Sequence, residues 1–135
     1  NMPKLVSLAI AATLLFAAAA AHSADEPTQA KQPLYAVAAE GKDATAEISK
    51  LAGISPFFHL YSEKGEAVEV VPNPYLDLEV GTGPAAAQML IGKGVVVLVA
   101  RRIPGPKLMD VIDANNVRFV RRTGTVQDVA NELRE

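Results

Sequence analysis

The chain has 135 residues, 50% of them hydrophobic, and a formal net charge of -2 at pH 7. This length suits one globular domain with its own core, and the slightly acidic balance argues against a general nucleic-acid-binding protein, which would carry a basic excess to neutralise phosphates. The sequence has no cysteine, which excludes disulfides, cysteine-ligated zinc and iron–sulfur clusters held by protein thiolates. Any bound metal would therefore need histidine, carboxylate or methionine ligands.

Residues 1–24 have the pattern of a signal peptide. Lys4 precedes a long apolar stretch, LVSLAIAATLLFAAAAA, and small residues then allow cleavage after Ala21, Ser23 or Ala24. The stretch is nearly long enough to span a membrane, so an uncleaved anchor is the alternative interpretation. A soluble amphipathic helix is disfavoured because the stretch is apolar all round. We expect a periplasmic or secreted protein that touches a membrane only through an uncleaved signal segment.

Residues 25–33 are polar, contain two prolines and predict a linker, so a single domain is expected over residues 34–135. Apolar periodicity and turn residues predict the elements of this domain. In chain order they are a strand over 34–40, a polar loop with one helical turn capped by Asp43 or Thr45, a hairpin over 56–74 that turns at Lys64 and Gly65, a helix over 81–94, a strand over 95–100, a helix over 104–116, a strand over 117–120 and a helix over 125–135.

Strands and helices alternate through the second half of the chain. This order predicts parallel strands joined by right-handed crossovers, and the hairpin makes the sheet mixed. The run from Val95 to Ala100 is apolar at every position, as in a central strand covered by helices on both faces. We therefore expect an α/β fold of three layers, with a mixed sheet of about five strands in the order 3-2-1-4-5.

Two of the predicted strands end on pairs of arginines. Arg101 and Arg102 follow the central strand, and Arg121 and Arg122 follow the next one. Ligands of open α/β sheets bind beyond the carboxyl ends of the parallel strands, where loops lead into helix N-termini. Guanidinium groups can bind carboxylate or phosphate through two parallel hydrogen bonds. The pattern predicts a site for an anionic small molecule.

Glycine-containing segments that lead into helices complete the predicted anion site. The residues they contribute are Gly81, Thr82, Gly83 and Gly124. The alternative rests on the alternation of side chains along a strand, which would leave only one arginine of each pair near a pocket. The other arginines would then lie at the surface or form ion pairs with Asp110, Asp113 or Glu132.

Several blocks of the sequence resemble, in their order and spacing, the NifX-like dinitrogenase iron-molybdenum cofactor biosynthesis family. The blocks are AGISPFF (52–58), NPY (73–75), GTGPAAAQML (81–90), IPGPKLMDVI (103–112) and TGTVQDV (123–129). The resemblance covers residues 34–135 and implies a ribonuclease-H-like α/β fold. It also implies a non-catalytic role in binding or carrying an anionic cofactor of the iron–sulfur or iron–molybdenum type, or its precursor, here bound without cysteine.

The chain departs from this family pattern in two places and in its expected location. Leu51 stands where cofactor-binding members commonly have a histidine, and Arg101 and Arg102 stand where the family usually has small residues. His59 lies nearby and is the only histidine of the expected mature domain, so it is the candidate metal ligand. The alternative is that it packs in the core, as a single histidine in a strand commonly does. Nitrogenase cofactor assembly is cytosolic, so export implies a different use.

Two other classes of function compete with a binding domain. A metal-dependent phosphodiester hydrolase needs converging carboxylates, and the candidates are scattered along the chain. They are Glu40, Asp43, Glu47, Asp77 and Glu79. One histidine in the expected mature domain and no cysteine do not assemble a nucleophilic site, so we expect no enzyme. The remaining class is a periplasmic protein–protein interaction module that forms a homodimer through the hairpin edge or a helix face.

Overall fold

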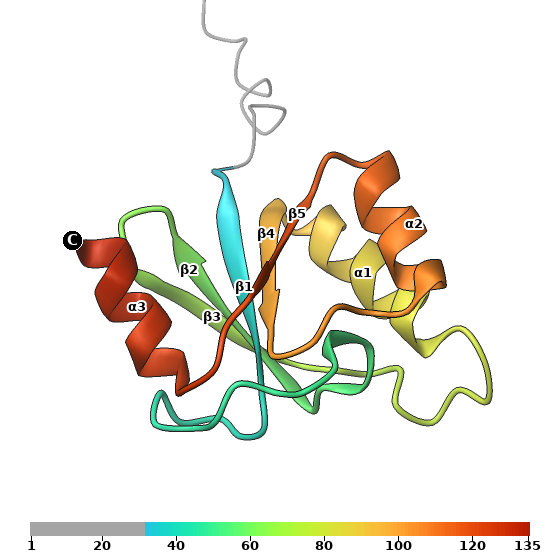
Figure 1. The fold of residues 1–135 in the computed structure, drawn as a ribbon, viewed down its shortest axis with the longest axis horizontal. Helices are drawn as coiled ribbons and strands as arrows, with labels where there is room; N and C mark the ends of the chain where they lie inside the picture. Colours follow the sequence, from blue (N-terminus) through green and yellow to red (C-terminus); the bar gives the residue numbers. More distant parts are fainter. Residues whose placement is uncertain (1–31) are drawn as a thin grey trace, which may run out of the picture. The chain divides into compact units, whose positions relative to one another are not determined.

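The computed structural model describes residues 32–135, so the predicted signal peptide and most of the predicted linker lie outside the described residues. The described unit contains five strands, three α-helices and one short 3-10 helix (Figure 1). They are β1 (Leu34–Ala39), η4 (Ala52–Ile54), β2 (Phe57–Ser62), β3 (Ala67–Pro72), α1 (Thr82–Gly92), β4 (Val95–Ala100), α2 (Pro106–Ala114), β5 (Arg118–Arg121) and α3 (Val126–Arg134). Among these described helices, none combines the length and the apolar character needed to cross a membrane.

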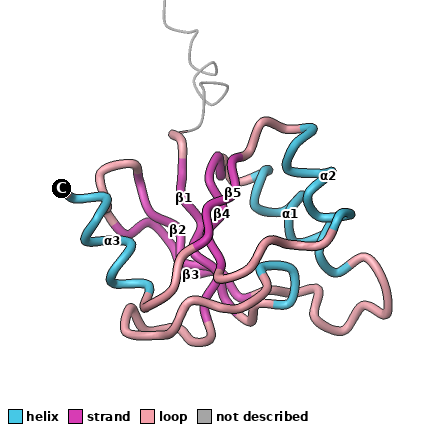
Figure 2. Tube along the Cα trace, viewed as in Figure 1, coloured by secondary structure: helices cyan, strands magenta, loops and turns pink. Residues whose placement is uncertain are grey.

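The five strands form one mixed sheet in the order β3-β2-β1-β4-β5, which confirms the predicted order (Figure 2). β1 pairs antiparallel with β2 and parallel with β4, β2 pairs antiparallel with β3, and β4 pairs parallel with β5. The hairpin therefore occupies one side of the sheet and the crossover units occupy the other. This arrangement confirms the expected ribonuclease-H-like α/β fold.

Helices cover both faces of the sheet, with α1 and α2 on one face and α3 on the other (Figure 1). The central strand β4 contributes to both cores because its side chains alternate between the two faces. Leu98 and Ala100 pack in the core beneath α1 and α2, whereas Val97 and Val99 pack in the core beneath α3. The fully apolar run of this strand is thus explained by burial on both sides.

The helix starts follow from local sequence. Gly81 has a φ of 81°, a left-handed conformation that favours glycine, and leads directly into α1. Pro106 occupies the first turn of α2, where its missing N–H costs no helical hydrogen bond. Thr125 and Asp128 form a capping box at the start of α3, in which each side chain accepts a hydrogen bond from the other residue's backbone N–H.

The predicted helical turn at Asp43 or Thr45 is wrong in position. The chain makes a simple turn there, in which the Ala46 N–H donates to the Asp43 carbonyl at 2.9 Å. The following segment is extended, because Glu47 and Ile48 form isolated bridges to two other segments. The helical turn comes later, as η4, and is one wall of the site described next.

Candidate ligand-binding site

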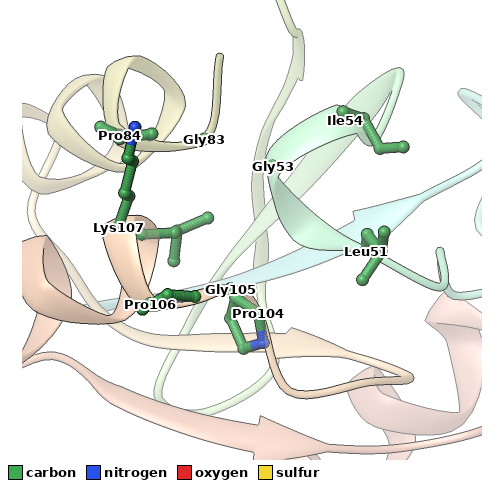
Figure 3. Close-up of a pocket in the computed structure, with 10 residues that line it drawn as sticks. Leu51, Gly53, Ile54, Gly83, Pro84, Pro104, Gly105, Pro106 and Lys107 are labelled. Carbon is green, nitrogen blue, oxygen red and sulfur yellow. The ribbon is translucent and has the colours of Figure 1, made fainter. Parts of the chain in front are cut away.

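A pocket of about 360 Å³ lies where η4 meets the N-terminal ends of α1 and α2 (Figure 3). Three loops build it: the segment before and through η4, the entry to α1 and the entry to α2. The residues that line it are Leu51, Gly53, Ile54, Gly83, Pro84, Pro104, Gly105, Pro106, Lys107 and Leu108. The walls are therefore mainly aliphatic and proline side chains, and this set includes no carboxylate.

This pocket offers several backbone N–H donors and one side-chain ammonium. The first turns of α1 and α2 place the N–H groups of Gly83, Lys107 and Leu108 at the pocket, and no backbone carbonyl of the described chain accepts a hydrogen bond from them. Neither helix has a side-chain cap at its N-terminus. Lys107 extends from α2 towards Pro84 of α1 (Figure 3). Uncapped helix N-termini carry partial positive charge, so the pocket favours negative charge.

Two glycines set the distance between η4 and α1. A Cβ atom placed on Gly53 would lie 2.9 Å from the Cα atom of Gly83, which is closer than real side chains approach a backbone. A Cβ atom on Gly83 would in turn lie 3.4 Å from the Leu108 side chain. The glycines of the AGISP and GTGP blocks therefore allow two backbones to touch directly, and both glycines line the pocket.

Buried polar side chains hold η4 in place. Asn73, from the NPY block, donates through Nδ2 to the carbonyl of Ser55 at 3.0 Å and to that of Gly53 at 3.3 Å. The Ser55 hydroxyl lies 2.8 Å from the Phe57 carbonyl oxygen and 3.1 Å from the Ala39 carbonyl oxygen, which share its single donor hydrogen, and 2.9 Å from the Ser49 hydroxyl. Ser55 and Asn73 are almost fully buried, so these bonds form in a low-dielectric interior where unpaired groups are costly.

The predicted glycine-segment residues separate into different places. Gly83 lines the pocket, and Gly81 and Thr82 lie just before it at the start of α1. The Thr82 hydroxyl donates to the Leu78 carbonyl at 3.4 Å. Gly124 has a φ of 106° and packs against Asp128, so it shapes the turn into α3 and lies outside this pocket.

Three of the four predicted arginines lie together, but in a second, separate pocket. Arg101, Arg121 and Arg122 line it together with Thr123, whereas Arg102 is exposed and lines neither pocket. Only one arginine of the first pair lines this pocket, whereas both members of the second pair do. Strand alternation does not decide this, because Arg101, Arg102 and Arg122 all lie beyond the ends of β4 and β5, where the pleat no longer fixes the side-chain direction.

The remaining candidate residues have structural surroundings. His59 is buried in β2, and its Nε2 atom lies 2.8 Å from the carbonyl oxygen of Gly41. That contact ties the loop after β1 to the sheet. Within residues 32–135, no three histidine or carboxylate side chains are grouped so that they could hold a metal ion, and the five predicted carboxylates therefore do not converge there.

Sequence reasoning missed most of the walls of the apolar pocket. Leu51 and Ile54 are exposed aliphatic residues, and Pro104 and Pro106 resemble ordinary loop residues in the sequence. The available signal was the repeated pairing of glycine with proline in GISP, GTGP and IPGP, directly before or within a short helix. Each of these segments contributes to the same pocket.

An α/β domain with an open, mainly apolar pocket at two helix N-termini belongs to the class of small-ligand-binding domains. Residues 33–135 match the family model described as "Dinitrogenase iron-molybdenum cofactor", and the chain therefore belongs to this family. This match confirms the resemblance found in the sequence. A comparison with curated proteins finds no match.

Solved structures with the same fold agree with the family assignment. The apo form of the orange protein from Desulfovibrio gigas is 27% identical, with a TM-score of 0.67 over 76% of this chain and 86% of that chain. A putative NifB protein from Thermotoga is 33% identical, with a TM-score of 0.62 over 75% of this chain and 89% of that chain. Together, the family and these structures fit a cofactor-binding or carrier role.

Proposed function

We propose that this protein binds and carries an anionic metal–sulfur cluster in the apolar pocket between η4, α1 and α2, and that it catalyses no reaction. The observation that carries the proposal is the composition of this pocket. Its walls are mainly apolar, it offers unpaired N–H donors and the Lys107 ammonium, and no carboxylate is among the lining residues. Such a site offers an anion positive potential and van der Waals contact together.

The apolar walls favour a soft anion over a hard one. A small oxyanion such as molybdate or phosphate is strongly hydrated, and an apolar pocket cannot replace the water that the anion would lose. A sulfur-surfaced anion spreads its charge over larger, polarisable atoms, holds its water less tightly and gains contact with aliphatic side chains. The pocket is therefore better suited to a thiometallate or an iron–sulfur-type cluster.

The side chains at this pocket also favour release of the ligand. No thiolate is present in the chain, and Leu51 lines the pocket at the position where the family resemblance implies a histidine in cofactor-binding members. The cluster would then be held by N–H donors, Lys107 and apolar contacts, without a coordinate bond from the protein. Non-covalent binding of this kind suits a carrier, which must pass its ligand on.

The proposed site of action is outside the cytoplasm. The signal-peptide pattern of residues 1–24 supports this location.

The homodimer predicted through the hairpin edge stays a prediction. β3 is an edge strand of the sheet, and its Val68 and Val70 are 53% and 43% exposed. Measuring the mass of the protein in solution tests it.

The test of the cluster site compares two anions of equal charge and shape. Tetrathiomolybdate presents four sulfur atoms and molybdate presents four oxygen atoms, so a spectroscopic titration with each separates soft from hard recognition. We expect tetrathiomolybdate to bind at least about tenfold more tightly than molybdate, since desolvating the oxyanion is the larger cost. Equal affinities, or no binding of tetrathiomolybdate, would overturn the proposal.

A matched pair of glycine variants locates the binding site. Gly105 lines the pocket with a φ of -66°, and a Cβ atom added to it meets no other atom within 4 Å. Gly105→Leu should therefore fold normally and fill the pocket, which removes tetrathiomolybdate binding. Gly92→Leu is the control, because a Cβ atom at Gly92 also meets nothing within 4 Å and the residue lies outside the pocket. Unchanged binding in Gly105→Leu would place the ligand elsewhere.

A further inference from the structure

The second pocket, lined by Arg101, Arg121, Arg122 and Thr123, has a volume of about 310 Å³. It lies beyond the carboxyl ends of the adjacent parallel strands β4 and β5, where Ala100 is the register partner of Arg121. The apolar pocket does not include any of these four residues. Two chemically different hollows thus lie near the same end of β4, one apolar and one rich in arginine.

The charges at the arginine pocket are only partly compensated. Arg122 forms an ion pair with Glu132 of α3. Arg101 donates through Nε to the Ile48 carbonyl at 2.9 Å, and its Nη1 atom lies 4.0 Å from a Glu47 carboxylate oxygen. Arg121 forms no ion pair or side-chain hydrogen bond with any residue in 32–135. Three guanidinium groups therefore face two carboxylates, which leaves one positive charge without a partner.

The bonds of Arg101 and Arg122 also fix where their remaining donors point. A guanidinium group has five N–H donors in a planar fork, so one bond to a carbonyl or carboxylate leaves several N–H groups unused. Because one end of each group is anchored, little side-chain freedom is lost when the free edge binds an anion. The anchored pair and the unpartnered Arg121 together supply a partly preorganised set of donors.

Thr123 adds two further unused donors. Within the described part of the chain, neither its backbone N–H nor its hydroxyl forms a hydrogen bond. The residue follows Arg122 directly and lines the pocket. Arginine, hydroxyl and backbone N–H groups are the donors that commonly bind phosphate or carboxylate oxygens.

We propose that this arginine pocket is a second ligand site, which binds a small oxyanion of the phosphate or carboxylate type. The pocket is polar and open to water, so a hydrated oxyanion can bind while it exchanges only part of its hydration shell for charge-assisted hydrogen bonds. This selectivity is opposite to that of the apolar pocket. The inference concerns different residues and does not depend on the proposed cluster site.

Arg102 provides a matched control in the same loop. It has the same charge as Arg101, is exposed, and lines neither pocket. Removing Arg102 or Arg121 lowers the net charge of the protein equally. A difference between the two variants therefore reports a local site and not the general electrostatic field of the protein.

The test is calorimetric titration of the full-length protein with inorganic phosphate and with citrate, at low ionic strength and with chloride as the reference anion. Arg121→Ala should weaken binding of the preferred anion about tenfold or more, because the lost contact is charge-assisted. Arg102→Ala should change it by less than about twofold, as for a screened surface charge. Comparing phosphate with citrate decides whether phosphoryl or carboxylate oxygens are preferred.

Three results would overturn this inference. The first is that the unmodified protein binds neither phosphate nor citrate more tightly than chloride. The second is that Arg102→Ala weakens binding as much as Arg121→Ala, which would assign the effect to diffuse charge. The third is that Arg121→Ala also abolishes tetrathiomolybdate binding, which would assign both anions to one site. Failure of the cluster proposal alone leaves the phosphate and citrate results unaffected, so the two proposals are tested separately.

Discussion

Replacing Asn73 with alanine should destabilise the protein and loosen the apolar pocket together. Asn73 is 6% exposed, and its side chain makes three hydrogen bonds. Nδ2 donates to the Gly53 and Ser55 carbonyls at 3.3 and 3.0 Å, and Oδ1 accepts from the Tyr75 N–H at 3.0 Å. The alanine variant loses all three bonds and leaves the buried Ser55 carbonyl without this donor.

The size of the effect follows from these bonds. Each typical hydrogen bond contributes about 1 kcal/mol net, and a buried group left without its partner costs about 1 to 3 kcal/mol. The weakest of the three, at 3.3 Å, is partly exposed and contributes least. We expect the free energy of unfolding to fall by about 2 to 4 kcal/mol, a large part of the roughly 5 to 15 kcal/mol of a typical domain.

Urea denaturation followed by circular dichroism measures this loss, because a lower midpoint at an unchanged slope reports a change in stability alone. Asn115→Ala is the matched control. The Asn115 Nδ2 also donates to a backbone carbonyl, that of Val111 at 2.8 Å, but at the exposed end of α2. That variant should change the free energy of unfolding by no more than about 0.5 kcal/mol.

A binding measurement separates a local effect from a global one. Under conditions where Asn73→Ala remains folded, tetrathiomolybdate affinity should fall, because Gly53 and the rest of η4 are no longer held against α1. If the two asparagine variants lose equal stability, the hydrogen bonds of Asn73 do not fix η4 as described. If stability falls and affinity does not, the pocket wall is held by other contacts.

Three further predictions follow from other parts of the chain. Gly53→Ala should lower the free energy of unfolding, measured by denaturant titration, by about 1 to 3 kcal/mol, because its Cβ atom forces η4 away from α1. Gly92→Ala should leave this free energy unchanged or raise it by up to about 1 kcal/mol. Equal effects of the two substitutions would refute the close contact between η4 and α1. Burial raises the pKa of the Tyr61 hydroxyl above its ordinary value of 10.0, so the free energy of unfolding should fall as pH rises from 10 through the higher folded-state pKa. Tyr61→Phe should show a shallower alkaline decline, and an identical decline would contradict this cause. Mature protein from a periplasmic extract should begin between His22 and Asp25 on N-terminal sequencing, and membrane-bound protein with an intact N-terminus would contradict cleavage.

The sheet could be predicted from sequence because its determinants are local or follow general chirality rules. The apolar run from Val95 to Ala100 marks the central strand, and Lys64 and Gly65 mark the hairpin turn. Right-handed crossovers then leave few possible strand orders. The sequence predicts the helical turn too early in the chain. Pairing of Glu47 and Ile48 with distant residues holds the segment before η4 extended, and a local sequence pattern does not show such pairing.

The site could be predicted only in part. The rule that ligand sites lie beyond the carboxyl ends of parallel strands predicted that the arginines would lie close together. Arg101, Arg121 and Arg122 do line one pocket. The sequence also named Glu132 as a candidate ion-pair partner, and Arg122 does pair with Glu132 of α3, but the sequence did not show which arginine would do so. The sequence did not predict the apolar pocket, because its walls come from three loops that are brought close together only by the tertiary fold.

The contact between Gly53 and Gly83 restricts how this chain can vary in evolution. The obstacle to a side chain at Gly53 is the backbone of α1, so no replacement of residue 83 by another amino acid can make room. Room can come only from a change in the path of the chain, for example in the exposed residues 76–81, which follow the hydrogen-bonded Asn73 and lead into α1. In an alignment of relatives, a non-glycine residue at position 53 should therefore coincide with insertions or deletions in this loop and with no particular partner residue.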